Sequence, residues 1–387
     1  MTVESQQTAV RCVIMRGGTS KGLYFHADDL PPAGDSRDRV LKRLMGSPDI
    51  LQIDGLGGSR PVTSKVAIIA RSARPDADVD YTFGQVDIDR DLIGYVGNCG
   101  NISSGVGPFA IDEGLVTTTE PTTTVRIYNT NTDKVLVAQV PVTEGRARVT
   151  GDCVIAGVPG SGAEIVMDYS ATAGAVSGRL LPTDHATDPM TLEDGSSFDV
   201  TLCDVGNPCV FVAATDLGLS GSEPPEAISS DAALMTTIGE IQAKAGQLFG
   251  VWPDWRQVHN PGFPLLVMVA PSADYPDSNG DVHAADSMDL RARLVFVNRC
   301  HDSMAGTGAV CLAAASRING SVPHRMLERG VAESDILRIG HPLGVMDVVV
   351  ALRAETDCGE TRLAKLGFAR TARRLMDGVA YVPREPE

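Results

Sequence analysis

Cys99-Gly100-Asn101 opens a segment, residues 101–111, that is rich in Gly, Ala and Ser and has hardly any charge, and Ala305-Gly306-Thr307-Gly308 opens a second such segment, residues 306–318. We interpret both as helices. Gly inside a helix costs roughly 1 kcal/mol relative to Ala, and a sequence accepts that cost where another group must approach the backbone closely. The two segments therefore predict two tightly packed, buried helices.

A second pair of motifs accompanies these helices. Gly17–Gly22 precedes the apolar Leu23–Phe25, and Gly206–Cys209 precedes Val210–Val212. A small-residue helix follows each glycine loop, which gives a weak internal repeat with a period of about 190–200 residues. We therefore expect two similar domains that face one another, 1–182 and 183–387, with the boundary in 177–189. A return of the last strand to the first domain stays open.

The rest of the chain predicts a mixed α/β (α+β) fold. Short β-branched runs between turn residues predict mostly antiparallel strands at 9–15, 65–70, 125–128, 135–140, 146–150, 200–203, 209–213, 265–270, 291–298, 336–339 and 345–352. Helical spacing with clear ends predicts two further helices, at 36–45 and 231–249.

Composition and charge exclude several classes of protein. Apolar residues make up 43% and charged residues 21% of the 387-residue chain, as in a globular protein. The net charge of −16 repels nucleic acid and anionic membranes, so we expect neither as a partner. An anionic substrate must then be held by a local cluster of cations and backbone amides.

The sequence also predicts a cytoplasmic location. We find no targeting segment, and the longest apolar stretches are too short to span a bilayer. None of the eight cysteines forms a CxxC pair, which fits reduced thiols and gives no zinc or redox motif. The oligomeric state stays open, a homodimer included.

Two helix starts that face one another would direct two positive helix ends at one small polyanion. Cys99 directly precedes the first helix, where backbone amides favour a thiolate, and Asn98, Gly100 and Asn101 around it suit an anion-binding nest. A lysine could reach the same cleft as a cation or base. Lys65 and Lys21 each follow a Thr-Ser pair at a strand, and their settings alone do not choose between them.

Familiar cofactor motifs are absent from the sequence. Gly17–Gly22 lacks the Gly-Lys-Ser/Thr order of a P-loop, and Gly55–Gly58 lacks the spacing of a dinucleotide fingerprint. The seven histidines lie too far apart for a helical metal pair. We therefore expect no metal and no cofactor.

At this point the motifs resemble a known family, the PrpF family, which groups methylaconitate isomerases, methylitaconate isomerases and 4-oxalomesaconate tautomerases or isomerases. The resemblance covers nearly the whole chain and rests on Met15–Gly22, Gln52–Gly58, Thr63–Ala67, Asn98–Asn101, Val106–Ala110, Arg299–His301 and Gly340–Pro342. Four further stretches look most like the 4-oxalomesaconate branch: Gly46–Asp49, Gln52–Gly55, Asp76–Tyr81 and Arg370–Arg373.

The resemblance implies the diaminopimelate epimerase fold, with two pseudo-symmetric domains that each wrap a sheet around a central helix. The epimerases place one Cys in each half. Here the first position is Cys99 and the second falls on Ala305, which argues against a two-thiol racemase. The resemblance also implies that Lys65, rather than Lys21, works with Cys99.

The implied chemistry moves a proton within an unsaturated tricarboxylate. Removing a proton gives a delocalised dienolate, which amides at the helix starts would stabilise, and returning it at another atom completes a tautomerisation or a double-bond shift. We predict that Cys99 and Lys65 transfer the proton. Candidate substrate-binding residues are Thr19, Ser20, Ser64, Asn98, Gly100, Asn101, Arg299, Gly306, Thr307, Gly308, Arg16, Asn207 and His301.

Three functions follow from this reasoning. The first is isomerisation of 4-oxalomesaconate in the degradation of gallate-type or protocatechuate-type aromatics. The second is the same chemistry on 2-methylaconitate or a methylitaconate. The third, from a different class, is non-catalytic binding of polycarboxylates.

Overall fold

The computed structural model describes residues 6–258, 263–353 and 362–384. The first half contains β1 (Gln7–Gly17), β2 (Ser20–His26), α1 (Asp35–Met45), β3 (Lys65–Arg71), β4 (Val79–Val86), β5 (Ile93–Gly94), α2 (Gly100–Asp112), β6 (Thr122–Asn129), β7 (Lys134–Thr143), β8 (Arg146–Ala147) and β9 (Ile165–Asp168).

The second half contains β10 (Asp188–Thr191), β11 (Ser197–Val205), β12 (Asn207–Ala213), α3 (Pro225–Ser230), α4 (Ala232–Leu248), β13 (Leu265–Pro271), β14 (Tyr275–Pro276), β15 (Val282–His283), β16 (Leu290–Phe296), β17 (Arg299–Cys300), α5 (Gly306–Ser316), α6 (Val322–Arg325), β18 (Ile336–His341) and β19 (Gly344–Arg353). The chain closes with β20 (Arg362–Arg370) and β21 (Ala372–Pro383).

The strands of the two halves pair in the same succession of directions. β1 is antiparallel to β2, β2 parallel to β3, β3 antiparallel to β4, β4 parallel to β6, β6 antiparallel to β7, and β7 antiparallel to β9. The second half repeats these directions: β11 is antiparallel to β12, β12 parallel to β13, β13 antiparallel to β16, β16 parallel to β18, β18 antiparallel to β19, and β19 antiparallel to β20. The repeat confirms the two pseudo-symmetric halves expected from the sequence.

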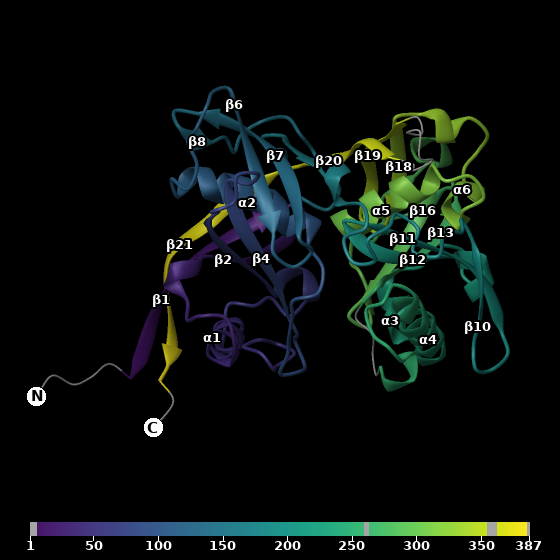
Figure 1. Cartoon of the computed structure of the whole chain (residues 1–387), viewed down its shortest axis with the longest axis horizontal. Helices are drawn as coiled ribbons and strands as arrows, with labels where there is room; N and C mark the ends of the chain where they lie inside the picture. The colour runs from purple at the N-terminus through teal and green to yellow at the C-terminus, as the bar shows by residue number, and fades with distance from the viewer. Residues whose placement is uncertain (1–5, 259–262, 354–361, 385–387) are drawn as a thin grey trace, which may run out of the picture.

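Each half wraps its sheet around one central helix (Figure 1). Every residue of α5 is buried, and so is every residue of α2 except Asp112. Their small side chains let the strands pack against the helix backbone, and both helices share one apolar core. On the outer faces of the sheets, α1 covers one smaller core and α3 with α4 covers another. The expectation of two buried, small-residue helices is therefore confirmed.

The last two strands join the halves. β20 pairs with β19 through its first residues and with β9 through its last, so it crosses from one lobe to the other (Figure 1). β21 then runs antiparallel along the whole length of β1. The chain end thus returns to the sheet of the first half.

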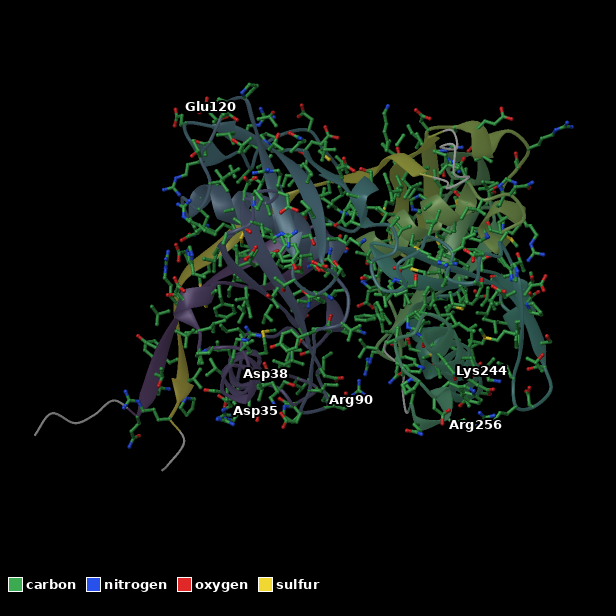
Figure 2. All side chains as sticks on the ribbon, viewed as in Figure 1. Asp35, Asp38, Arg90, Glu120, Lys244 and Arg256 are labelled. Carbon is green, nitrogen blue, oxygen red and sulfur yellow. The ribbon has the colours of Figure 1, made fainter. Side chains whose placement is uncertain are left out.

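The outer surface carries much of the charge. Figure 2 shows Asp35, Glu120, Lys244 and Arg256 among the side chains at the periphery of the two lobes. Within the described ranges, no helix is long and apolar enough to cross a membrane. The described cysteines have free thiols, Cys358 lying outside the described residues.

Candidate active site

The starts of α2 and α5 meet where the two halves of the molecule join. Cys99 is the N-cap residue of α2 and Ala305 is the N-cap residue of α5, and neither side chain caps its own helix. The first N–H groups of a helix have no partner within it, so two sets of free donors converge here. Both N-cap residues line one small pocket between the halves.

This pocket, which we call the Cys99 pocket, brings together a group of polar side chains inside an apolar frame. Its polar members are Lys65, Asn98, Cys99, Asn207, His301 and Thr307, and its apolar members are Phe83, Val96, Leu265, Phe296 and Ala305. Six of the candidate residues from the sequence analysis therefore share one pocket.

Lys65 is held in the Cys99 pocket by strand register and by its neighbours. It is only 3% exposed, and its Nζ donates a hydrogen bond of 2.5 Å to Gln85 Oε1, directly opposite on β4. The Gln85 amide is itself fixed, because its Nε2 donates to the Ser64 carbonyl at 3.0 Å. Nζ also lies 5.3 Å and 5.8 Å from the ring centroids of Phe83 and Phe296.

Burial changes the acid–base properties of Lys65. Desolvation lowers the pKa of the ammonium group below its ordinary value of 10.5, and nearby Cys99 offsets only part of that shift. Cys99 lines the same pocket, and its proximity acts against the desolvation of the Lys65 charge. A lysine with a lowered pKa gives up its proton more readily than an exposed lysine, and the neighbouring thiol offers a second group that can carry a proton.

His301 faces the same pocket in its neutral form. Burial, together with the charge of Lys65, lowers the pKa of His301 to about 3. Its Nδ1 accepts a hydrogen bond of 3.0 Å from the backbone N–H of Ser303. The ring proton therefore sits on Nε2, which makes His301 a neutral donor rather than a cation.

Asn207, from the second half, fixes the chain just before Cys99. Its Oδ1 accepts from the Asn98 N–H at 2.8 Å, and its Nδ2 donates to the Asn98 carbonyl at 2.8 Å and to Thr307 Oγ1 at 2.9 Å. These bonds use the whole Asn207 amide, so its role in the structure is to lock the two helix starts together. Asn98, in contrast, has a buried Nδ2 with no partner among the described residues.

Thr19 and Asn101 lie on the other side of the α2 start. Asn101 Nδ2 donates to Thr19 Oγ1 at 3.1 Å, and Thr19 Oγ1 also lies 3.1 Å from Ser303 Oγ of the second half. The glycine loop before Thr19 fits tightly here, because a Cβ on Gly18 would lie 2.2 Å from Asn101 Oδ1. Gly18 also has a φ of +51°, which favours glycine.

The remaining candidates lie outside the Cys99 pocket. Arg16 donates to the carbonyls of Gly18 and Thr371, and the Ser64 hydroxyl accepts from Gln52. The Ser20 hydroxyl is buried with no hydrogen-bond partner among the described residues. A Cβ on Gly308 would clash with Leu294, so Gly308 serves packing.

Two further residues lie near the pocket or at its rim. Gly306 packs against Gly100 at the junction of the helices. Arg299 is exposed and lines a neighbouring depression that shares Phe296 and His301 with the Cys99 pocket. Lys21, the alternative that the local sequence left open, pairs with Arg16 in the β1–β2 hairpin.

Sequence reasoning missed Gln85, Ser303 and Arg370. Gln85 fixes the Lys65 ammonium group, and the available indication was a polar residue that continues the alternating apolar positions Val79, Tyr81 and Phe83. Arg370 is an arginine at the end of a strand with apolar Leu366 and Phe368, and it is only 5% exposed. A buried arginine in such a strand is the indication that could have been used.

Two pseudo-symmetric halves, each with a sheet wrapped around one central helix, define the diaminopimelate epimerase-like class of isomerases. A hydroxyproline epimerase from Agrobacterium vitis shares this fold, with a TM-score of 0.59 at 13% identity over 98% of this chain and 93% of that chain.

The chain belongs to the PrpF family of isomerases, because the family model described as "PrpF protein" matches residues 7–383. It is 45% identical to the 3-methylitaconate isomerase of Eubacterium barkeri, over 98% of this chain and 99% of the relative. It is 41% identical to the 4-oxalomesaconate tautomerase of Pseudomonas putida, over 98% of both chains. The crystal structure of a methylitaconate-delta-isomerase superposes with a TM-score of 0.78 at 46% identity, over 98% of this chain and 97% of that chain.

Proposed function

We propose that the protein is a cofactor-independent isomerase that moves a proton within an unsaturated polycarboxylate, with Lys65 and Cys99 as the two proton-transfer groups. The observation that supports this proposal is that a desolvated lysine and a thiol at a helix start line the same small pocket. One group can take a proton from a carbon next to a carboxylate or carbonyl. The other can return a proton at a different atom of the delocalised anion, so the protons balance without a redox partner.

The surroundings of the pair suit a carbanion intermediate. The starts of α2 and α5 direct amide N–H groups into the pocket, where they can stabilise developing negative charge. His301 can donate a further hydrogen bond from Nε2 without adding a full charge. The rings of Phe83 and Phe296 lie near the buried Lys65 ammonium group, and a less polar environment strengthens these interactions.

As substrate we propose 4-oxalomesaconate, formed during the breakdown of gallate-type aromatics. The motifs 46–49, 52–55, 76–81 and 370–373 support this choice through their resemblance to that branch. The 45% identity to a 3-methylitaconate isomerase supports a second candidate, the allylic shift in methylitaconate. Both reactions use the same two groups and differ in the number of carboxylates on the substrate.

A direct comparison of substrates tests the proposal. Purified protein is mixed in turn with 4-oxalomesaconate, 2-methylaconitate and methylitaconate, and the change in diene or enol absorbance is followed. We expect turnover of at least one acid, with the highest kcat/KM for 4-oxalomesaconate. Tight binding of all three acids without turnover would overturn the proposal and favour a non-catalytic polycarboxylate-binding protein.

A further inference from the structure

Arg370 is a buried cation whose charge the protein does not neutralise. It ends β20, the strand that crosses between the lobes (Figure 1), and its guanidinium lies 4.4 Å from the centroid of the Phe368 ring. Among the described residues, no Asp or Glu forms an ion pair with it. A charge removed from water without a partner is costly, so a protein that keeps one has a use for it.

The guanidinium also has hydrogen-bonding capacity to spare. Nε donates to Asn101 Oδ1 at 3.0 Å, and one Nη donates to the neighbouring Ala369 carbonyl at 2.9 Å. The other Nη points at Met346 Sδ at 3.0 Å, and a thioether is a weak acceptor. Since an arginine has five N–H donors, both Nη atoms keep donors for a ligand. Burial lowers the pKa of Arg370 to about 10, and the group stays charged at neutral pH.

Arg370 lines a second pocket, which we call the Arg370 pocket. Buried Ser303 and His341 line it too, together with Thr19. Burial and the nearby Arg370 lower the pKa of His341 to about 3, so the ring is neutral. The acidic residues of this pocket, Asp152, Glu164 and Asp347, are exposed at its rim, where water screens them.

The Arg370 pocket adjoins the Cys99 pocket at two points. Asn101, which accepts from Arg370, is two residues after Cys99 in the first turn of α2. Ser303, in the Arg370 pocket, donates its backbone N–H to His301, which lines the Cys99 pocket. The hydrogen-bonded hydroxyls of Thr19 and Ser303 lie on this boundary, one from each half of the chain.

We propose that Arg370 binds a substrate carboxylate remote from the reacting carbons, so that the site is built for a tricarboxylate and penalises a dicarboxylate. This inference rests on the proposed function and adds the substrate class to it. A planar guanidinium with a free N–H on each Nη matches the two oxygens of a carboxylate. A dicarboxylate, held at the helix starts by its two acid groups, would leave that cation unpaired.

Binding of a saturated, unreactive acid tests this inference separately from catalysis. Tricarballylate, with three carboxylates, is compared with glutarate, with two, by calorimetry on the full chain. We expect wild type to bind tricarballylate more tightly than glutarate. In Arg370→Met the affinity for tricarballylate should fall about 10- to 100-fold, as for the loss of a charge-assisted hydrogen-bonded pair, and that for glutarate should change little. Arg370→Lys, which keeps the charge but loses the fork, should give an intermediate loss.

The control is Arg373→Gln, which removes the same charge at an exposed position three residues further on and should leave both affinities unchanged. Equal losses for tricarballylate and glutarate in Arg370→Met would overturn the inference. It would also be overturned if inorganic phosphate bound at Arg370 while tricarballylate binding ignored the substitution. If Arg370→Met does not fold, unchanged tricarballylate binding in Arg370→Lys overturns it in the same way. Failure of the proposed function would appear differently, as the absence of turnover in a wild type that still prefers tricarballylate.

Discussion

Gly100 and Gly306, the first residues of α2 and α5, lie backbone against backbone. A Cβ atom on Gly100 would lie 3.0 Å from Gly306 Cα and 2.9 Å from the Thr307 nitrogen. Neither neighbour can move without moving a helix, because both atoms belong to the backbone of α5. The glycine at position 100 therefore sets the distance between the two helix starts at the Cys99 pocket.

Gly100→Ala tests whether that distance matters. The added methyl group should force the helix starts apart, with a loss of about 1–3 kcal/mol of stability and a fall in kcat/KM of at least about tenfold, the effect of 1.36 kcal/mol on a barrier. The control is Gly239→Ala in α4, where no heavy atom lies within 4 Å of the new Cβ. It should stabilise the protein by up to about 1 kcal/mol and leave activity unchanged. Wild-type activity and stability in Gly100→Ala would show that the close approach is incidental.

Lys65→Met should separate stability from catalysis. Turnover should fall about 10²- to 10⁴-fold, the range for loss of a general acid or base. Because burial lowers the pKa of Lys65 in the folded state, the unfolded chain binds the proton more readily. The stability of wild type should therefore rise with pH between the lowered pKa and 10.5.

Lys65→Met lacks this titrating group. The thermal midpoint of the variant minus that of wild type should therefore be largest at a pH below the lowered pKa of Lys65. This difference should become smaller as the pH rises toward 10.5. Thermal unfolding at a series of pH values measures the difference. A difference that does not change with pH would mean that the Lys65 ammonium group is solvated in the folded protein.

Local sequence predicted the central helices well, because a continuous run of small, uncharged residues can be recognised without knowing what packs against it. The helix predicted at 101–111 is α2, Gly100–Asp112, and the one at 306–318 is α5, Gly306–Ser316. Several strands were missed, among them β4, β9, β20 and β21. β21 exposes Leu375 and Val379, and Asp377-Gly378 separates its two short apolar stretches, so it lacks the regular alternation of a half-buried strand. It is a strand because β1 offers it a partner across its full length.

The residues of the candidate site that stand in continuous sequence motifs could be predicted from the sequence. Lys65 and Cys99 stand in such motifs, whereas the Gln85 contact depends on the register between β3 and β4, which local sequence does not reveal. Arg370 depends on a strand that crosses from the other lobe. Arg299 was expected in the site, but it is exposed and lines the neighbouring depression. It follows a tight turn at Val297 and Asn298, which have φ values of +50° and +55°.

Exhaustive dialysis against a chelator should leave activity unchanged. One group takes the proton and another returns it, so the proposed chemistry has no step that needs a metal. The assay compares kcat before and after dialysis against EDTA, with and without added Mg²⁺, Mn²⁺ or Zn²⁺. Recovery of activity only after a divalent ion is added would contradict the proposed mechanism.

Cys99→Ser tests the second proton-transfer group. Serine keeps a hydrogen-bonding group at the start of α2 but replaces the thiol with a hydroxyl that ionises far less readily. Turnover should fall by at least about 10²-fold. The affinity for tricarballylate should change little, because the amide groups of both helix starts and the Lys65 ammonium group remain. Calorimetry and steady-state kinetics on the same preparation measure the two effects.

Proton exchange in D₂O then distinguishes which step depends on Cys99. Wild type should introduce deuterium at the position that receives the returning proton. If Lys65 takes the first proton, Cys99→Ser should still exchange deuterium into the unreacted substrate while forming product slowly; if Cys99 takes it, both exchange and turnover should fall together. Lys65→Met should show the opposite pattern to Cys99→Ser, because the two groups act on opposite steps. If Cys99→Ser keeps both turnover and exchange at the wild-type rate, Cys99 is a structural thiol and the pair proposed here does not perform the reaction.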